Sequence, residues 1–179
     1  MMKIYEINDL SNDKVVNILK KGLTESLFKN PKLYENYLYD YKDSRANLFN
    51  RLENGQYKIG AYYVLADEND NYIASAGWNQ MNSDTALLLT RMSVSLPYKT
   101  SGILGHTILP LMIEKTSSYN KVWMTCNEYN IAIQKWFTRK QEGKSLALSW
   151  SWPDVYKRFE PIGKHTVNGI QQYVFQLKK

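Results

Sequence analysis

A short polar loop between two apolar segments is the part of the sequence best suited to binding an anion. The loop is Leu96-Pro97-Tyr98-Lys99-Thr100-Ser101-Gly102, and it separates an apolar run typical of a buried strand from an apolar run typical of a helix. The first backbone N–H groups of a helix are unpaired, and the helix dipole favours negative charge there. With Lys99 beside them, these amides could bind a pyrophosphate. The same residues also fit an ordinary helix start, with Thr100 or Ser101 as the N-cap.

Other catalytic chemistries find little support in the residue spacing. The two histidines, His106 and His165, have no carboxylate at a spacing typical of a metal site, so no metal is expected, and His106 is better explained as a packed or capping residue. The single cysteine, Cys126, cannot form an internal disulfide and fits a buried inert thiol better than a nucleophile. The sequence contains no phosphate-binding P-loop, nucleophile elbow or zinc-ligand spacing.

The composition indicates one soluble domain spanning residues 1–179. Apolar residues make up 44% of the chain, enough to fill a core, but no run approaches the roughly 20 apolar residues of a membrane helix. The N-terminus lacks the apolar segment of a signal peptide, so we expect a cytoplasmic protein. The net charge is +6, but Lys and Arg are scattered along the chain, so nucleic acid is not the expected partner.

The elements that must position the loop follow from the hydrophobic pattern. Alternation and short β-rich runs predict strands, apolar residues three and four apart predict helices, and Asn-Gly pairs mark turns. In chain order we expect a strand at 2–7, helices after the N-cap Ser11 and from Asn30 to Leu52, strands at 58–66, 72–81 and 85–94, a helix at 103–116, a strand at 121–126, a helix at 127–140 and a hairpin of 156–162 with 170–177, while 143–153 fit no element. A parallel crossover flanked by hairpins makes this an α/β fold with a mixed sheet, in the order β-α-α-β-β-β-α-β-α-β-β.

This element order and the stretch RMSVSLPYKTSGILGHTILPLM resemble the GCN5-related N-acetyltransferases, the GNAT family. In that family a strand ending in Val leads into Arg/Gln-x-x-Gly-x-Gly/Ala and a helix. Here Val94 ends the strand, Lys99 takes the Arg/Gln place and Gly102 the first glycine, while Leu104 stands at the second, where it would crowd a pyrophosphate, with Gly105 next to it. The resemblance implies a GNAT-like acyl-CoA N-acyltransferase fold with acetyl-CoA as co-substrate. The residues it implies for binding that co-substrate are Met92, Ser93, Val94, Lys99, Thr100, Ser101, Gly102, Ile103, Leu104, Gly105, Asn127 and Asn130.

The resemblance extends to the next strand and helix, KVWMTCNEYNIAIQKWF. The family uses an Asn there to contact the pantetheine arm, and Asn127 or Asn130 is the counterpart in this chain. Either Asn could equally be an N-cap. Many members place a Tyr seven residues beyond this Asn as the acid that protonates the departing thiolate. In this chain those positions hold Gln134 and Phe137, which cannot serve as that acid.

The general base is also absent from its usual place. In the family it is often a Glu on the central strands, or ordered water replaces it. No Glu lies on 72–81 or 85–94, and Thr90 and Arg91 are the polar interruptions of the second strand. Arg91 could contact an acidic substrate group or form a salt bridge at an edge. The candidates for a catalytic residue are Glu128 and Tyr129.

Two functions are compatible with these residues. The first is an N-acetyltransferase that moves an acyl group from acetyl-CoA to a small-molecule or peptide amine by direct attack in a ternary complex. The second is a catalytically inactive GNAT-like module that binds a protein or nucleic-acid partner, which Leu104 and the missing Tyr and Glu favour. Trp78 could shape the acceptor pocket or pack on the sheet. The final hairpin could pair between subunits and give a homodimer.

Overall fold

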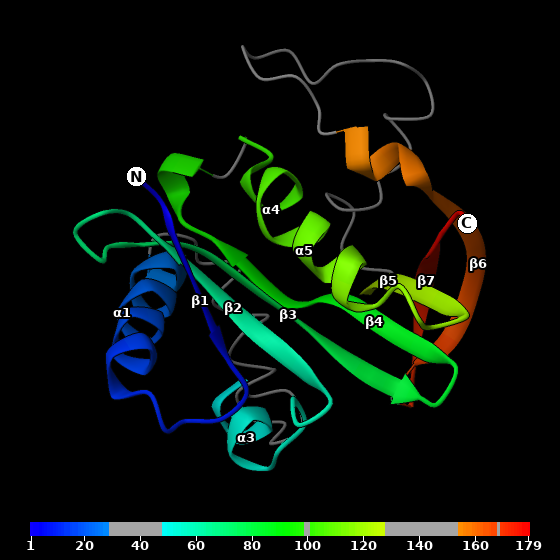
Figure 1. Cartoon of the computed structure of the whole chain (residues 1–179), viewed down its shortest axis with the longest axis horizontal. Coiled ribbons are helices and arrows are strands. Elements are labelled where there is room, and N and C mark those ends of the chain that lie inside the picture. Colours follow the sequence, from blue (N-terminus) through cyan, green and yellow to red (C-terminus); the bar gives the residue numbers. More distant parts are fainter. Residues whose placement is uncertain (29–47, 99–100, 128–153, 168) are drawn as a thin grey trace.

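A mixed β-sheet forms the centre of the molecule. The computed structural model describes residues 1–28, 48–98, 101–127, 154–167 and 169–179. Across this part of the chain, seven strands pair in the order β1-β2-β3-β4-β5-β7-β6 (Figure 1). All neighbours are antiparallel except β4 and β5, which run parallel. The strands are β1 (Lys3–Ile7), β2 (Gly60–Ala66), β3 (Tyr72–Asn82), β4 (Thr85–Val94), β5 (Lys121–Asn127), β6 (Phe159–Val167) and β7 (Ile170–Leu177).

Helices cover both faces of this sheet. One face carries α1 (Asp13–Phe28) and α3 (Leu48–Glu53), and the other carries α4 (Ile103–His106) and α5 (Ile108–Lys115) (Figure 1). Two short 3₁₀ helices, η1 (Leu96–Tyr98) and η2 (Asp154–Arg158), follow β4 and precede β6.

Strand β2 shows how the sequence builds two cores at once. Successive side chains of a strand point to opposite faces. Ala61, Tyr63 and Leu65 join the core under α4 and α5, whereas Tyr62 and Val64 join the core under α1 and α3. All five are at most 2% exposed. An unbroken apolar run is therefore required here, because both faces of the strand are covered.

The strands lie close to their predicted positions. The bounds of β4 are as predicted, and residues Thr85–Leu88 are buried, as the apolar first half of this strand indicates. Strand β2 begins two residues later than expected, because Lys58 N–H donates to the Gly55 carbonyl in a turn. Gly55 follows α3 with φ of 73°, the left-handed conformation that ends a helix. The helix predicted from Asn30 to Leu52 ends in α3, and its residues 30–47 lie outside the described residues. Asn127, the first residue of the helix predicted at 127–140, is the last residue of β5 instead, and 128–140 and the unassigned 143–153 lie outside the described residues.

The single helix predicted at 103–116 is wrong, since the chain breaks at Thr107 into α4 and α5. The cause is Pro110. A proline inside a helix lacks the N–H that would bond the carbonyl four residues earlier, and its ring collides with that carbonyl. Here that carbonyl belongs to His106, the last residue of α4. The Thr107 side chain instead donates to the Ile103 carbonyl at 2.6 Å.

The predicted N-cap of α1 is also wrong by one residue. Asn12 caps the helix, because its side-chain oxygen accepts the N–H of Val15 at 3.3 Å. Ser11 instead donates its hydroxyl and its N–H to the carboxylate of Asp9. Both residues are good N-caps in isolation, so local propensity could not choose between them.

The C-terminal hairpin starts later than predicted. Tyr156 lies in η2 rather than in a strand, and β6 begins at Phe159. Tyr156 and Phe159 are both buried, at 0% and 4% exposure, and their spacing of three fits one turn of 3₁₀ helix rather than strand alternation. Strand β6 is an edge strand with a register shift between Pro161 and Gly163, and Gly163 has φ of 108°.

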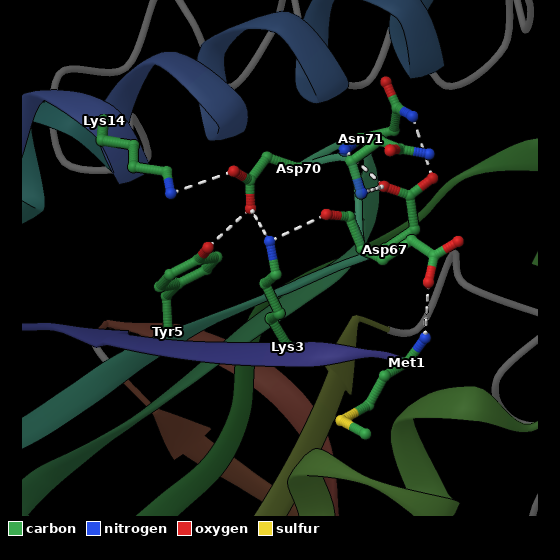
Figure 2. A network of polar contacts seen from close by, with 9 residues as sticks. Met1, Lys3, Tyr5, Lys14, Asp67, Asp70 and Asn71 are labelled. Atoms are coloured by element: carbon green, nitrogen blue, oxygen red, sulfur yellow. Dashed lines mark hydrogen bonds and ion pairs between the residues drawn. The ribbon is translucent and has the colours of Figure 1, made fainter.

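A polar network fixes the β2–β3 turn to the N-terminus (Figure 2). The Asp70 carboxylate accepts bonds from Tyr5 Oη at 2.6 Å, Lys3 Nζ at 3.0 Å and Lys14 Nζ at 2.9 Å. These partners come from β1 and α1, so one side chain joins three elements. The Tyr5 hydroxyl, then Lys14 and Lys3, hold the pKa of Asp70 well below its usual range.

Candidate functional site

The two parallel strands at the centre of the sheet pair over only part of their length. Thr85–Leu88 of β4 pairs with Lys121–Met124 of β5. Strand β4 then continues to Val94, whereas the last residues of β5 pair with β7 on its other side. Among the described residues, no strand pairs with Leu89–Val94 on the side of β5. The second half of β4 thus leaves its parallel partner at the carboxyl end of the strands, where open α/β sheets bind ligands.

The same half of β4 is irregular against β3. The successive pairs are Asn79–Leu87, Gly77–Thr90 and Ser75–Ser93. From one pair to the next, the partner on β3 changes by two residues and the partner on β4 changes by three. Each interval between pairs therefore contains one extra residue of β4, which is the geometry of a β-bulge. Leu89 and Arg91 have φ of 54° and 52°. This left-handed conformation costs a non-glycine residue about 1–2 kcal/mol and persists only where its surroundings hold it.

Three tyrosine hydroxyls contact this bulged segment from the face that carries α1 and α3. In order along β4 the contacts are Tyr57 Oη to Thr90 Oγ1 (3.0 Å), Tyr62 Oη to the Arg91 carbonyl oxygen (2.7 Å) and Tyr72 Oη to the Ser93 carbonyl oxygen (3.2 Å). We call Tyr57, Tyr62 and Tyr72 the tyrosine triad. Tyr57 precedes β2, Tyr62 belongs to β2 and Tyr72 belongs to β3, so the contacts to β4 come from its neighbour β3 and from the strand beyond it.

Ser75 joins two members of the triad. Its buried Oγ lies 3.0 Å from Tyr62 Oη and 2.9 Å from Tyr72 Oη. The three hydroxyls carry three protons for four contacts, so Tyr72 must share its proton between two acceptors. Tyr72 donates to Ser75, Ser75 donates to Tyr62, and Tyr62 donates to the Arg91 carbonyl, with the Ser93 carbonyl as a second acceptor for Tyr72. Such chains polarise one another and strengthen each bond.

Two glycines make room for the triad. A Cβ atom at Gly77 would lie 2.5 Å from Tyr57 Cε1 and 2.7 Å from Tyr62 Cδ2, so the two rings fill the space where a side chain would be. Gly77 is the β3 partner of Thr90, and its missing side chain lets Tyr57 reach across β3 to β4. Gly22 of α1 does the same for Tyr72, whose ring would collide with any Cβ there.

Burial keeps the Tyr57 hydroxyl protonated. Desolvation raises the pKa of Tyr57, and the bond to Thr90 and the positive charges of Arg51 and Arg91 offset only part of that rise. The phenol is therefore neutral at physiological pH. It can position Thr90 through a hydrogen bond, but it is not a general base.

The predicted anion-binding loop lies directly after β4. Lys99 and Thr100 are outside the described residues. Ser101 closes the turn, because its Oγ donates to the Tyr98 carbonyl at 2.7 Å and accepts the Ile103 N–H at 3.3 Å. Gly102 is the N-cap of α4, with φ of 68°. The N-cap predicted at Thr100 or Ser101 is thus wrong by one or two residues, because the turn needs a left-handed residue at its end and glycine adopts that conformation freely.

Leu104, which stands at the family's second glycine position, is buried. Leu104 and Ile103 are 3% and 9% exposed and belong to the core between the sheet and α4–α5, and Gly105 is buried beside them. The Leu104 side chain is therefore part of the packed core. Because α4 spans only Ile103–His106, its dipole is also weaker than that of the long helix predicted from the sequence.

The other residues implied for binding acetyl-CoA lie on the two central strands or beyond them. Met92 and Val94 are half-buried, with side chains packed on the core under α4 and α5. Ser93 carries the carbonyl that Tyr72 contacts. Asn127 is the last residue of β5 and pairs with Gln172 of β7. Glu128, Tyr129 and Asn130 lie outside the described residues.

The remaining chemistry-bearing residues have structural surroundings. Cys126 is 4% exposed, and burial raises the pKa of its thiol to about 11, which fits the predicted inert thiol. His106 is exposed in the last turn of α4 rather than packed, and the ring of His165 lies 5.2 Å from that of Trp123. Within the described ranges no three possible ligands gather into a metal site. Trp78 is buried against Tyr119 under α5, so it packs in the core.

Sequence reasoning missed the tyrosine triad. The triad lies at 57, 62 and 72, remote in sequence from the β4 residues that it contacts. One signal was present, since Thr90 and Arg91 interrupt an otherwise apolar strand, and a buried tyrosine needs a partner for its hydroxyl. The sequence spacing alone, however, does not show that the tyrosines contact Thr90 and Arg91, because that depends on the register of the sheet.

Solved structures with the same fold are acetyltransferases by name. An acetyltransferase from Streptococcus agalactiae superposes with a TM-score of 0.63 at 14% identity, covering 99% of this chain and 98% of that one. A GNAT-family acetyltransferase from Staphylococcus aureus gives 0.58 at 15% identity, with both chains fully covered. The N-acetyltransferase PseH from Campylobacter jejuni gives 0.50 at 12% identity, covering 99% and 98%. No family model and no curated protein sequence matches the chain.

The chain has the GNAT fold, as the sequence resemblance implied. The likeness extends over nearly the whole length of both partners. Structural superposition at such low sequence identity establishes the fold, and the activity has to be argued from the site. No helix among the described residues is long and apolar enough to cross a bilayer.

Proposed function

We propose that this chain is an acyl-CoA-dependent N-acyltransferase, with acetyl-CoA as donor and a small-molecule or peptide amine as acceptor. The observation that carries the proposal is the separation of β4 from β5 beyond Leu88, within a GNAT fold. A strand edge of this kind offers backbone N–H and C=O groups to an extended ligand. The amide-bearing arm of coenzyme A is such a ligand.

Different parts of β4 and of the loop after it bind different parts of acetyl-CoA. Backbone groups of Met92–Val94 bind the amide-bearing arm. Backbone N–H groups of the bulged segment polarise the carbonyl of the thioester, since such donors are most effective where negative charge develops. Lys99 to Gly105, with the amides of the turn and the Lys99 ammonium, bind the pyrophosphate. Asn127 or Asn130 contacts the arm from the side of β5.

Acetyl-CoA supplies an activated acyl carbon and a leaving thiolate. The amine nitrogen forms its bond to the acyl carbon, the carbon–sulfur bond breaks, and the thiolate takes a proton. The amine must lose a proton before or during attack. No carboxylate lies on β3 or β4, so Glu128, Tyr129 or a water held by this chain removes the proton or returns it to sulfur.

Thermal unfolding with and without acetyl-CoA tests the binding half of the proposal. A ligand at 100 times its dissociation constant adds about 2.7 kcal/mol, which raises the midpoint by roughly 5–10 °C for a domain of this size. Lys99→Glu should weaken acetyl-CoA binding by about tenfold or more, because it replaces a charge-assisted bond with repulsion. Lys21→Glu, the same charge change on the exposed side of α1, is the matched control and should bind as the wild type does.

Release of free thiol from acetyl-CoA in the presence of amine mixtures tests the catalytic half. Thiol release together with an acetylated amine, identified by mass spectrometry, supports the enzyme. Binding without thiol release across small amines and peptides would instead favour an inactive binding module. The absence of any stabilisation by millimolar acetyl-CoA refutes the proposal as a whole.

A further inference from the structure

The bulged half of β4 is held in a strained shape by groups that do not belong to β4. Two left-handed residues, Leu89 and Arg91, give β4 two more residues than the facing part of β3 can pair. A strand free to relax would lose these bulges and continue its ladder. The triad hydroxyls contact this stretch at three successive points, Thr90, Arg91 and Ser93.

We infer that Tyr57, Tyr62 and Tyr72 are positioning residues for the acyl donor. Their hydroxyls fix the carbonyl and N–H groups of Leu89–Ser93 in the orientation that binds the thioester end of acetyl-CoA. This inference rests on the proposed function, and it adds residues that the binding motif itself does not include. The triad acts through the strand that its hydroxyls contact.

The surroundings of the triad fit a positioning role. The Tyr57 and Tyr62 side chains are fully buried, and Gly77 and Gly22 leave space that only the rings fill. Rings packed in this way cannot change rotamer without a rearrangement of the core. The hydroxyl chain through Ser75 then ends on the Arg91 carbonyl, in the middle of the bulged segment. Because the buried rings are fixed, their hydroxyls hold the backbone of β4 in place.

A paired substitution, Tyr62→Phe with Tyr72→Phe, removes two hydroxyls and leaves the rings in place. The matched control is Tyr5→Phe, which removes a hydroxyl of the edge strand β1 that is bonded to Asp70 rather than to β4. If the pair prevents folding, Ser75→Ala breaks the same chain with a smaller change. Binding is measured by calorimetry with two probes, acetyl-CoA and adenosine 3′,5′-bisphosphate, which carries only the nucleotide end.

We expect the paired variant to bind acetyl-CoA about five- to tenfold more weakly, as expected for the loss of one or two hydrogen bonds. Its affinity for adenosine 3′,5′-bisphosphate should stay unchanged, because the triad hydroxyls contact β4 at Thr90, Arg91 and Ser93, before the loop begins. Amide hydrogen exchange at Thr90–Val94 should become about five- to tenfold faster, while exchange in β2 stays as in the wild type. Tyr5→Phe should change neither affinity.

The outcomes separate this inference from the proposed function. A wild-type chain that binds no acetyl-CoA overturns the proposed function and the positioning role together. Wild-type binding with equal affinity in the paired variant overturns the positioning role alone. An equal loss for both probes also overturns it, because a general loosening of the fold would then explain the result. If β4 exchange is unchanged, the triad does not hold the bulge.

Discussion

A single methyl group added at Gly77 should destabilise the protein by about 2–5 kcal/mol. The new Cβ would lie 2.5 Å from Tyr57 Cε1, 2.7 Å from Tyr62 Cδ2 and 3.0 Å from Tyr57 Cζ. Overpacking of this kind costs about 1–3 kcal/mol. Both rings must move, so the hydroxyl bonds to Thr90 and to the Arg91 carbonyl weaken, at about 0.5–1.5 kcal/mol each. Gly77 has an ordinary negative φ, so the effect comes from space and not from backbone strain.

Urea unfolding followed by tryptophan fluorescence measures the change. A double-mutant cycle with Tyr57→Leu identifies its source, because the smaller side chain leaves room for the new methyl group. If the rings fill the space over Gly77, the second substitution should offset about 1 kcal/mol or more of the first. A Gly77→Ala variant within about 0.5 kcal/mol of the wild type, the range of a neutral surface change, would refute the packing argument.

Three further predictions concern residues away from the triad. Asn12→Ala should lower the free energy of unfolding by about 0.5–2 kcal/mol through the lost cap, and Ser11→Ala by less; equal losses would contradict the cap assignment. Asp70→Asn should be less stable than the wild type at neutral pH. Since the Tyr5 hydroxyl and the two lysines hold the folded pKa of Asp70 below its ordinary value of 3.8, the difference should persist above that pH and shrink as pH falls through the folded pKa. Burial raises the pKa of the Cys126 thiol from its ordinary value of 9.0 to about 11, so this thiol should react with a thiol reagent roughly 10–100-fold more slowly in the folded protein than in urea. Equal rates would show that the thiol is accessible.

Most of the sheet could be predicted from the sequence because its signals are local. The bounds of β4 and the turn at Glu68–Asn71 follow from alternation, polar punctuation and burial on both faces. The break at Thr107 was also readable, since Pro110 cannot continue a helix from His106. The apolar residues on both sides of Thr107, however, favour one continuous helix.

The shape of the candidate site could not be predicted in this way. The bulges at Leu89 and Arg91 have no local cause in a strand rich in leucine. They depend on which residues of β3 face β4, and on tyrosine rings brought together by the pairing of β2 and β3. Such contacts arise between distant parts of the chain, so they follow from the fold rather than from the composition of the strand.

The irregular edge strand β6 limits how the molecule can associate. A regular edge strand is a template for another strand, and it invites sheet extension and fibril formation. Strand β6 combines Pro161, a break in register, a left-handed Gly163 and the exposed charges of Glu160 and Lys164. Each of these disfavours a continuous ladder with a second chain. A second copy would therefore not readily extend the sheet at β6, and molecules that meet at this edge in a crowded solution would not form a continuous ladder there.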